Sequence, residues 1–173
     1  DDALAMEGVL DVVTGEDLPE DVRIPMRMFN NEGMERFLQP PLAQGKVRYS
    51  GEPVAVVIAD SRYDAEDAAE QVFVDYEPLD PVLTATDADA DGAPLLHEET
   101  GTNHVTTVSV VRGDVQAAFE AADVIVSERL YSHRHGAVPL EPRGLVAEHD
   151  SESGRTTIWG AAKVVHMNHR ILA

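Results

Sequence analysis

Four of the seven histidines have a spacing that could bind a metal ion. His133 and His135 flank a single residue, and His166 and His169 lie three residues apart, on one face of a predicted helix. Four imidazoles could ligate zinc if the two segments met. The sequence gives no reason for them to meet, and no carboxylate at a suitable spacing supports the site. Ordinary surface or loop histidines are the favoured interpretation, and we assign no metal ligand.

A run of alternating aspartates raises a second metal hypothesis. Asp87, Asp89 and Asp91 are spaced like the first ligands of a calcium-binding loop. We take position 98 to be out of register with the glutamate that closes such a loop at its twelfth position. The residues around the aspartates are small, acidic and rich in breakers of regular structure, which is typical of a solvated linker. We therefore predict a linker over residues 84–103.

Lys163 is one of only two lysines in a chain that has eleven arginines. It follows the small residues Gly160, Ala161 and Ala162 and opens a predicted helix. Small residues allow a ligand to approach the backbone closely, and the start of a helix attracts anionic groups. A solvated lysine on an exposed turn is the alternative interpretation.

The elements that would position these residues follow from the hydrophobic pattern. The unbroken apolar run Val54–Ala59 predicts a strand that is buried on both faces in the middle of a sheet. Asp60 or Ser61 can cap a helix over residues 62–71. Its inner, apolar stripe is predicted to consist of Ala65, Ala68, Ala69 and Val72. Further strands are predicted over residues 8–14, 46–49, 73–76, 104–111 and 123–131. A helix over residues 115–122, a hairpin of residues 145–149 and 155–159, and a helix from residue 163 are also predicted.

Composition limits the class of protein. The 173 residues include 32 acidic and 13 basic side chains, for a net charge of −19, which opposes binding to nucleic acid. The absence of cysteine excludes thiolate ligands and a disulfide framework from this chain. No apolar run approaches the ~20 residues that span a bilayer. We expect a cytoplasmic protein. A halophilic source and a GC-rich genome explain the acidic, arginine-rich composition equally well.

Two separated sets of motifs resemble one enzyme family. Residues Lys46–Ala59, the alanine-rich helix after them and Val74–Leu79 are similar to the a/b hammerhead domain of the xanthine dehydrogenase, aldehyde oxidase and carbon monoxide dehydrogenase family. Segments 112–119, 139–144 and 157–160 resemble the entry into the molybdenum-cofactor domain of the same large, molybdopterin-binding subunit.

This resemblance implies an α+β chain with a hammerhead domain at residues 1–83, followed after the linker by the beginning of a mixed α/β cofactor-binding domain at 104–173. Both ends of the chain interrupt a pattern, so we expect a fragment of a larger polypeptide. Such subunits oxidise a small carbon substrate, of the aldehyde, N-heterocycle or carbon monoxide type, at a molybdopterin centre. Iron–sulfur clusters and FAD in partner subunits or domains take the electrons, which implies a hetero-oligomer and an inactive isolated chain.

The resemblance also assigns one candidate catalytic and cofactor-binding residue. In the family, a Ser-Thr-Gln motif places its glutamine near the apical oxo group of molybdenum, and Lys163 stands at the matching position here. A lysine can donate the same hydrogen bond and adds a positive charge. Structural roles, for example a buried ion pair, are expected for residues of the Pro-Leu-Glu-Pro-Arg motif: Pro139, Glu141 and Arg143.

The competing hypothesis is a hammerhead-type scaffold or interaction module without catalysis. Glycine-rich cofactor motifs in a longer gene product would favour the enzyme. The substrate and the presence of copper stay open on sequence alone.

Overall fold

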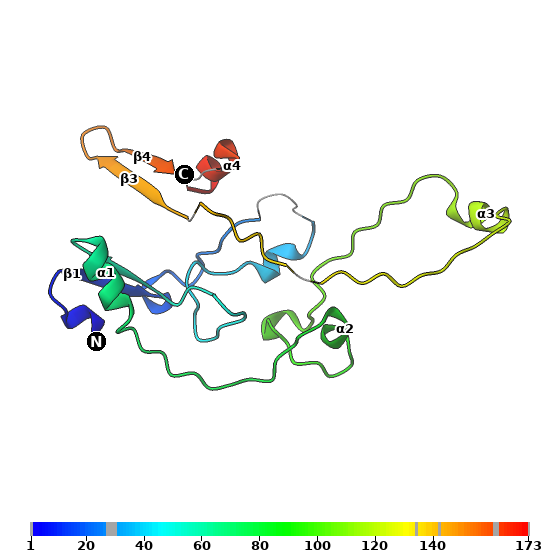
Figure 1. Cartoon of the computed structure of the whole chain (residues 1–173), viewed down its shortest axis with the longest axis horizontal. Coiled ribbons are helices and arrows are strands. Elements are labelled where there is room, and N and C mark those ends of the chain that lie inside the picture. The colour runs from blue at the N-terminus through cyan, green and yellow to red at the C-terminus, as the bar shows by residue number, and fades with distance from the viewer. Residues whose placement is uncertain (1, 27–30, 134, 142, 161–162, 173) are drawn as a thin grey trace. The chain divides into compact units, whose positions relative to one another are not determined.

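The computed structural model describes residues 2–26, 31–133, 135–141, 143–160 and 163–172. The chain divides into two units, residues 1–107 and residues 108–173, and each is described by itself. Figure 1 shows the order of helices and strands along the chain. Among the described residues, no helix is long and apolar enough to cross a membrane.

The first unit is built on an antiparallel pair of strands, β1 (Val9–Thr14) and β2 (Ala55–Ala59). Val13 lies opposite Val56, and the register shifts by one residue between Val9 and Asp11. The prediction that β2 is buried on both faces is wrong. Its side chains alternate in burial, and Val56 and Ile58 are 47% and 44% exposed. Within the described residues β2 pairs only with β1, and no layer covers its second face.

Helix α1 (Arg62–Ala69) follows β2 and packs against the sheet. The Ser61 hydroxyl caps it by accepting a hydrogen bond from the backbone N–H of Asp64, 3.2 Å away. Ala68 is completely buried, as its place on the predicted apolar stripe requires. The prediction is wrong for Ala69, which was placed on the same stripe and is exposed. Gly8 has a φ of +82°, and a Cβ there would lie 2.9 Å from the Asp64 carboxylate, so glycine lets the helix start close to β1.

Two further buried residues, Phe37 and Leu42, lie outside this sheet. Phe37 ends a 3-10 helix (Met34–Phe37). The ring of His97, which is only 8% exposed, meets the Phe37 ring edge-on at 5.6 Å between centroids. His97 precedes another 3-10 helix (Glu98–Thr100), so a segment inside the predicted linker packs against Phe37 within the first unit.

Short helices complete the first unit. A 3-10 helix (Ala3–Ala5) precedes β1 and another (Gly15–Asp17) follows it. Helix α2 (Ala85–Ala88) lies in the predicted linker and is capped by the Thr84 hydroxyl, which accepts from the N–H of Asp87 at 3.0 Å.

The second unit contains the predicted hairpin. Strands β3 (Leu145–Asp150) and β4 (Arg155–Gly160) pair antiparallel, with Val146 opposite Trp159. The carboxylate of Asp150 orders the turn by accepting hydrogen bonds from the N–H of Glu152 at 3.0 Å and the hydroxyl of Ser153 at 2.5 Å. These bonds lower the pKa of Asp150 below its ordinary value. Helices α3 (Val115–Glu120) and α4 (Val165–Leu172) confirm the two helices expected in this half.

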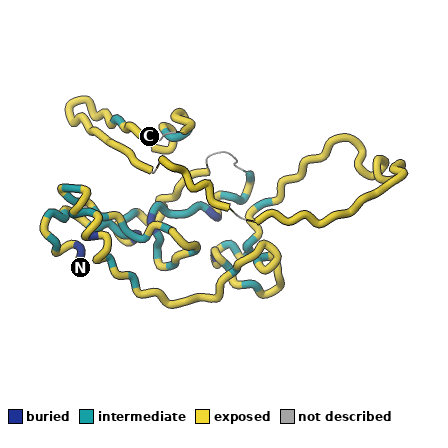
Figure 2. Tube along the Cα trace, in the orientation of Figure 1, coloured by how far each residue is buried: buried dark blue, intermediate teal, exposed yellow. Residues whose placement is uncertain are grey.

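Four predicted strands lack ladder hydrogen bonds in the structure: residues 46–49, 73–76, 104–111 and 123–131. The last two run to and from α3 and are almost entirely exposed, as Figure 2 shows. Val110 and Leu130 are 88% and 91% exposed. A strand is defined by its hydrogen-bonded neighbour, and the described residues supply no neighbour for these segments.

Candidate functional site

Lys163 lies in a turn between β4 and α4. The two alanines before it, Ala161 and Ala162, are outside the described residues. The carbonyl of Lys163 accepts a hydrogen bond from the side-chain amide of Asn168 at 3.0 Å, which ties the turn to the first part of α4. Val164 has a φ of +57°, an unusual value for a β-branched residue, and α4 begins at the next residue.

The side chain of Lys163 is exposed, and no described carboxylate forms an ion pair with it. An ammonium group in this setting can hold an anion through up to three hydrogen bonds. The described residues therefore fit an anionic cofactor such as molybdopterin at one edge, by a cationic contact from Lys163.

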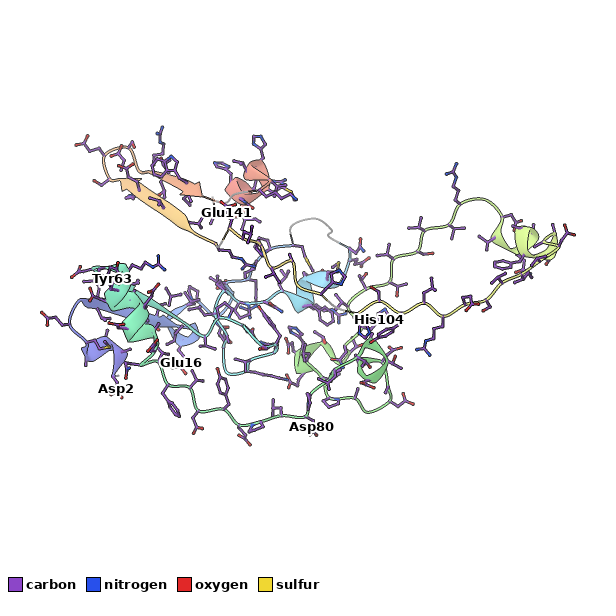
Figure 3. The ribbon with its side chains drawn as sticks, viewed as in Figure 1. Asp2, Glu16, Tyr63, Asp80, His104 and Glu141 are labelled. Atoms are coloured by element: carbon purple, nitrogen blue, oxygen red, sulfur yellow. The ribbon has the colours of Figure 1, made fainter. Side chains whose placement is uncertain are left out.

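The residues of the Pro-Leu-Glu-Pro-Arg motif precede β3, and Figure 3 marks Glu141 among them. Pro139, Glu141 and Arg143 are all exposed, and Pro142 lies outside the described residues. Among the described side chains, neither Glu141 nor Arg143 has an ion-pair partner. The structure thus shows no buried ion pair within this motif, and a structural role for these residues stays a prediction.

The histidines do not assemble a metal centre in the part of the chain that the structure describes. His135 Nδ1 lies 3.0 Å from the carbonyl oxygen of His133, and the ring of His133 packs edge-on against Tyr131 at 4.8 Å. His166 and His169 are exposed on α4, as the predicted helix face requires.

The interpretation that Glu98 is out of register with the closing position of a calcium loop is wrong. Counting from Asp87, Gly92 is the sixth residue and Glu98 the twelfth, which are the positions of the invariant glycine and the closing glutamate in a calcium loop. The structure uses Glu98 differently, because its carboxylate accepts a hydrogen bond from Lys46 Nζ at 2.5 Å. No group of three or more acidic or histidine side chains converges among the described residues.

A half-buried polar cluster around Lys46 was also missed. Lys46 Nζ donates to the carbonyl of Leu95 at 3.0 Å as well as to Glu98, and this ion pair lowers the pKa of Glu98 below its ordinary value. Arg48 and Glu52 are joined through the Arg48 backbone N–H, while Arg48 Nε and Glu52 Oε1 are buried without a described partner. Lys46 lies 49 positions from Leu95 and 52 positions from Glu98, so no local sequence pattern could have indicated these contacts.

Fold and site together define an α+β chain whose second unit presents an exposed cation after a hairpin. Residues 1–80 match the family described as "Aldehyde oxidase and xanthine dehydrogenase, a/b hammerhead domain", and residues 96–173 match the "Molybdopterin cofactor-binding domain". The chain belongs to the aldehyde oxidase and xanthine dehydrogenase family of molybdopterin proteins.

Individual relatives agree with this membership. The chain is 39% identical over 142 residues to the 6-hydroxypseudooxynicotine dehydrogenase complex subunit gamma of Paenarthrobacter nicotinovorans, covering 82% of this chain and 18% of the relative. It is 34% identical over 188 residues to the carbon monoxide dehydrogenase large chain of Hydrogenophaga pseudoflava, covering 100% of this chain and 22% of the relative.

A solved structure shares the fold. The quinoline 2-oxidoreductase of Pseudomonas putida 86 matches with a TM-score of 0.72 and 31% identity, over 92% of this chain and 20% of that chain. The likeness to this solved structure confirms the α+β fold class. The chain spans about a fifth of the length of the relatives it matches.

Proposed function

We propose that this chain is part of the large subunit of a molybdenum hydroxylase. The enzyme would oxidise a small carbon substrate of the aldehyde, N-heterocycle or carbon monoxide type. One observation carries the proposal: two domains of this family match in succession and together span residues 1–80 and 96–173. The names of the relatives, which include dehydrogenases and an oxidoreductase, support the same class of reaction.

Electron transfer would require other protein. The chain has no cysteine to ligate an iron–sulfur cluster, so the clusters and FAD would belong to partner subunits or domains. Relatives named as a complex subunit and as large chains support an assembly of several subunits.

Within this chain, Lys163 is the residue proposed to contact the cofactor. Molybdopterin, when bound, supplies the two-electron redox chemistry. Lys163 would hold it at the edge described above, by donating a hydrogen bond and by placing a positive charge beside an anionic group. Preorganised donors of this kind are typically worth ~3–4 kcal/mol of transition-state stabilisation, or a factor of 10²–10³ in rate.

The test uses the longer polypeptide that carries this chain, purified with its partners. Stoichiometric molybdenum by elemental analysis supports the enzyme, and its absence favours the scaffold hypothesis. Lys163→Met should lower the turnover number about 10²–10³-fold at saturating substrate with the molybdenum content retained, whereas Lys163→Gln should keep much more activity. Arg112→Met removes another exposed cation of the second unit and is the matched control. Parental turnover in Lys163→Met would refute the role of Lys163.

A further inference from the structure

One peptide bond in the first unit has the chemistry of a spontaneous rearrangement. Asp91 precedes Gly92, and this is the single Asp-Gly pair of the sequence, which has no Asn-Gly pair. In such a pair the backbone nitrogen of the glycine can attack the side-chain carboxyl carbon of the aspartate, because glycine has no Cβ to hinder the approach. The reaction requires both groups to be accessible and free of fixed partners.

Asp91 and Gly92 occupy the centre of an exposed turn. The N–H of Ala93 donates a hydrogen bond to the carbonyl of Ala90 at 3.1 Å, which closes the turn around the two residues. Both residues are exposed, and Gly92 has a φ of +77°. A Cβ at Gly92 would meet no atom within 4 Å, so no neighbouring segment crowds this peptide bond.

The two reacting groups have no competing partner in the part of the chain that the structure describes. The N–H of Gly92 donates to no backbone carbonyl, as is usual for the central peptide of a turn. The carboxylate of Asp91 forms no ion pair. The side chain of Asp91 is therefore free to rotate toward the Gly92 nitrogen.

Asp89 provides a matched comparison in the same loop. It is exposed like Asp91 and lies only two residues before it, so its acidic surroundings are similar. The residue after it is Ala90, whose Cβ hinders the backbone nitrogen that would have to attack. A difference in reactivity between the two aspartates therefore reports the effect of the glycine.

We propose that Asp91 is a site of isoaspartate formation, and this proposal is independent of the proposed function. The Gly92 nitrogen bonds to Cγ of the protonated Asp91 carboxyl, and one water leaves, which gives a five-membered succinimide. Water then opens the ring. Addition at Cγ restores aspartate, whereas addition at the main-chain carbonyl carbon gives isoaspartate, in which the main chain runs through Cγ. No electrons are transferred, and water is the only co-reactant.

The rearrangement acts on a loop that the side chain of Asn103 closes. The Asn103 amide donates to the carbonyls of Ala88 at 3.2 Å and Pro94 at 2.9 Å, which lie on either side of Asp91. Its oxygen accepts from the N–H of Leu96 at 2.9 Å. Isoaspartate inserts one methylene group into the main chain between the two carbonyls, so the loop must change its fit to Asn103. It also leaves a free main-chain carboxylate, the group that an isoaspartyl-specific carboxyl methyltransferase modifies.

The test incubates the full chain for several weeks at about pH 5, where aspartate carboxyls are partly protonated, and maps its peptides by mass spectrometry. We expect a succinimide form that is lighter by one water, followed by a form of parental mass. This last form should resist cleavage by endoproteinase Asp-N at residue 91 and accept a methyl group from a purified isoaspartyl methyltransferase. Conversion at Asp89 should be at least tenfold slower.

Two variants test the ring chemistry. Asp91→Glu keeps the charge but would need a six-membered ring, so conversion at this position should fall at least tenfold. Asp91→Asn should convert faster than the parent at neutral pH, because the same ring then forms with the loss of ammonia. In the converted parent, the side-chain amide NMR signals of Asn103 should shift.

No conversion at residue 91, or equal conversion at Asp89, would overturn the proposal. A parallel incubation in urea provides the remaining control. Conversion of Asp91 in urea but not in the folded chain would also overturn it, because the folded turn would then protect the pair. Unchanged Asn103 signals in the converted chain would overturn the effect on the loop. None of these readouts depends on molybdenum content or turnover.

Discussion

The ion pair between Lys46 and Glu98 joins segments that lie 52 positions apart. The Lys46 side chain is 20% exposed and the Glu98 side chain 65%, so solvent screens the pair from one side. The hydrogen bond from Lys46 lowers the pKa of Glu98 below its ordinary value of 4.5. This ion pair ties the segment that contains His97 and Glu98 to the segment around Lys46, and both segments belong to the first unit.

The pH dependence of stability should reveal this pair. A carboxyl whose pKa is lower in the folded state stabilises the fold above its unfolded pKa and stops doing so as the pH falls through the folded value. The stability difference between the parent and Glu98→Gln should therefore be constant above about pH 5.5 and shrink as the pH falls below 4.5.

Urea unfolding at a series of pH values measures this difference. Glu77→Gln, at an exposed position with no described hydrogen-bond partner, is the control and should show no such change. A difference between parent and Glu98→Gln that does not vary between pH 6 and pH 3 would contradict the assignment.

At the scale of secondary structure, α1 is the element with the clearest physical basis. A serine cap fixes its start, and its completely buried Ala68 fixes which side faces β1 and β2. The exposed residues Glu66 and Asp67 keep the opposite side in water. Local and tertiary preferences agree here, which favours a stable helix.

Ala68→Asp should destabilise the first unit by several kcal/mol, because it buries a carboxylate without a partner. Ala69→Asp makes the same chemical change one position later, where the side chain is exposed, and should cost less than about 1 kcal/mol. Thermal unfolding followed by circular dichroism compares the two. Equal melting temperatures for the two variants would show that α1 does not pack on the sheet through Ala68.

Across the part of the molecule that the structure describes, few apolar side chains are buried. The only hydrophobic residues classed as buried among the described ones are Ala3, Phe37, Leu42 and Ala68. Relatives of about five times this length have the additional protein that could cover the exposed segments around α3.

We expect residues 1–173 alone to retain no molybdopterin, because Lys163 is the one candidate contact to the cofactor that the described residues offer. Purification from a host that makes the cofactor, followed by molybdenum and pterin analysis, provides the measurement. One cofactor per chain would show that these residues suffice for binding.

Local interactions explain what could be predicted from the sequence. Helix α1 depends on its cap, in which the Ser61 hydroxyl accepts a hydrogen bond from the N–H of Asp64, three residues later. The β3–β4 hairpin depends on a turn that the Asp150 carboxylate orders. Both were predicted close to their observed bounds. The family was also recognisable, because its motifs are short and contiguous. The position of Lys163 as a candidate site comes from such a motif.

Only the tertiary structure decided which faces and partners these elements have. It showed β2 to have one partner and one open face, placed His97 against Phe37, and joined Lys46 to Glu98. These contacts depend on packing between residues distant in sequence, for which composition and periodicity carry no signal. For the same reason, the apolar pattern of residues 104–111 and 123–131 predicted strands, although a strand needs a neighbour that the described chain does not provide.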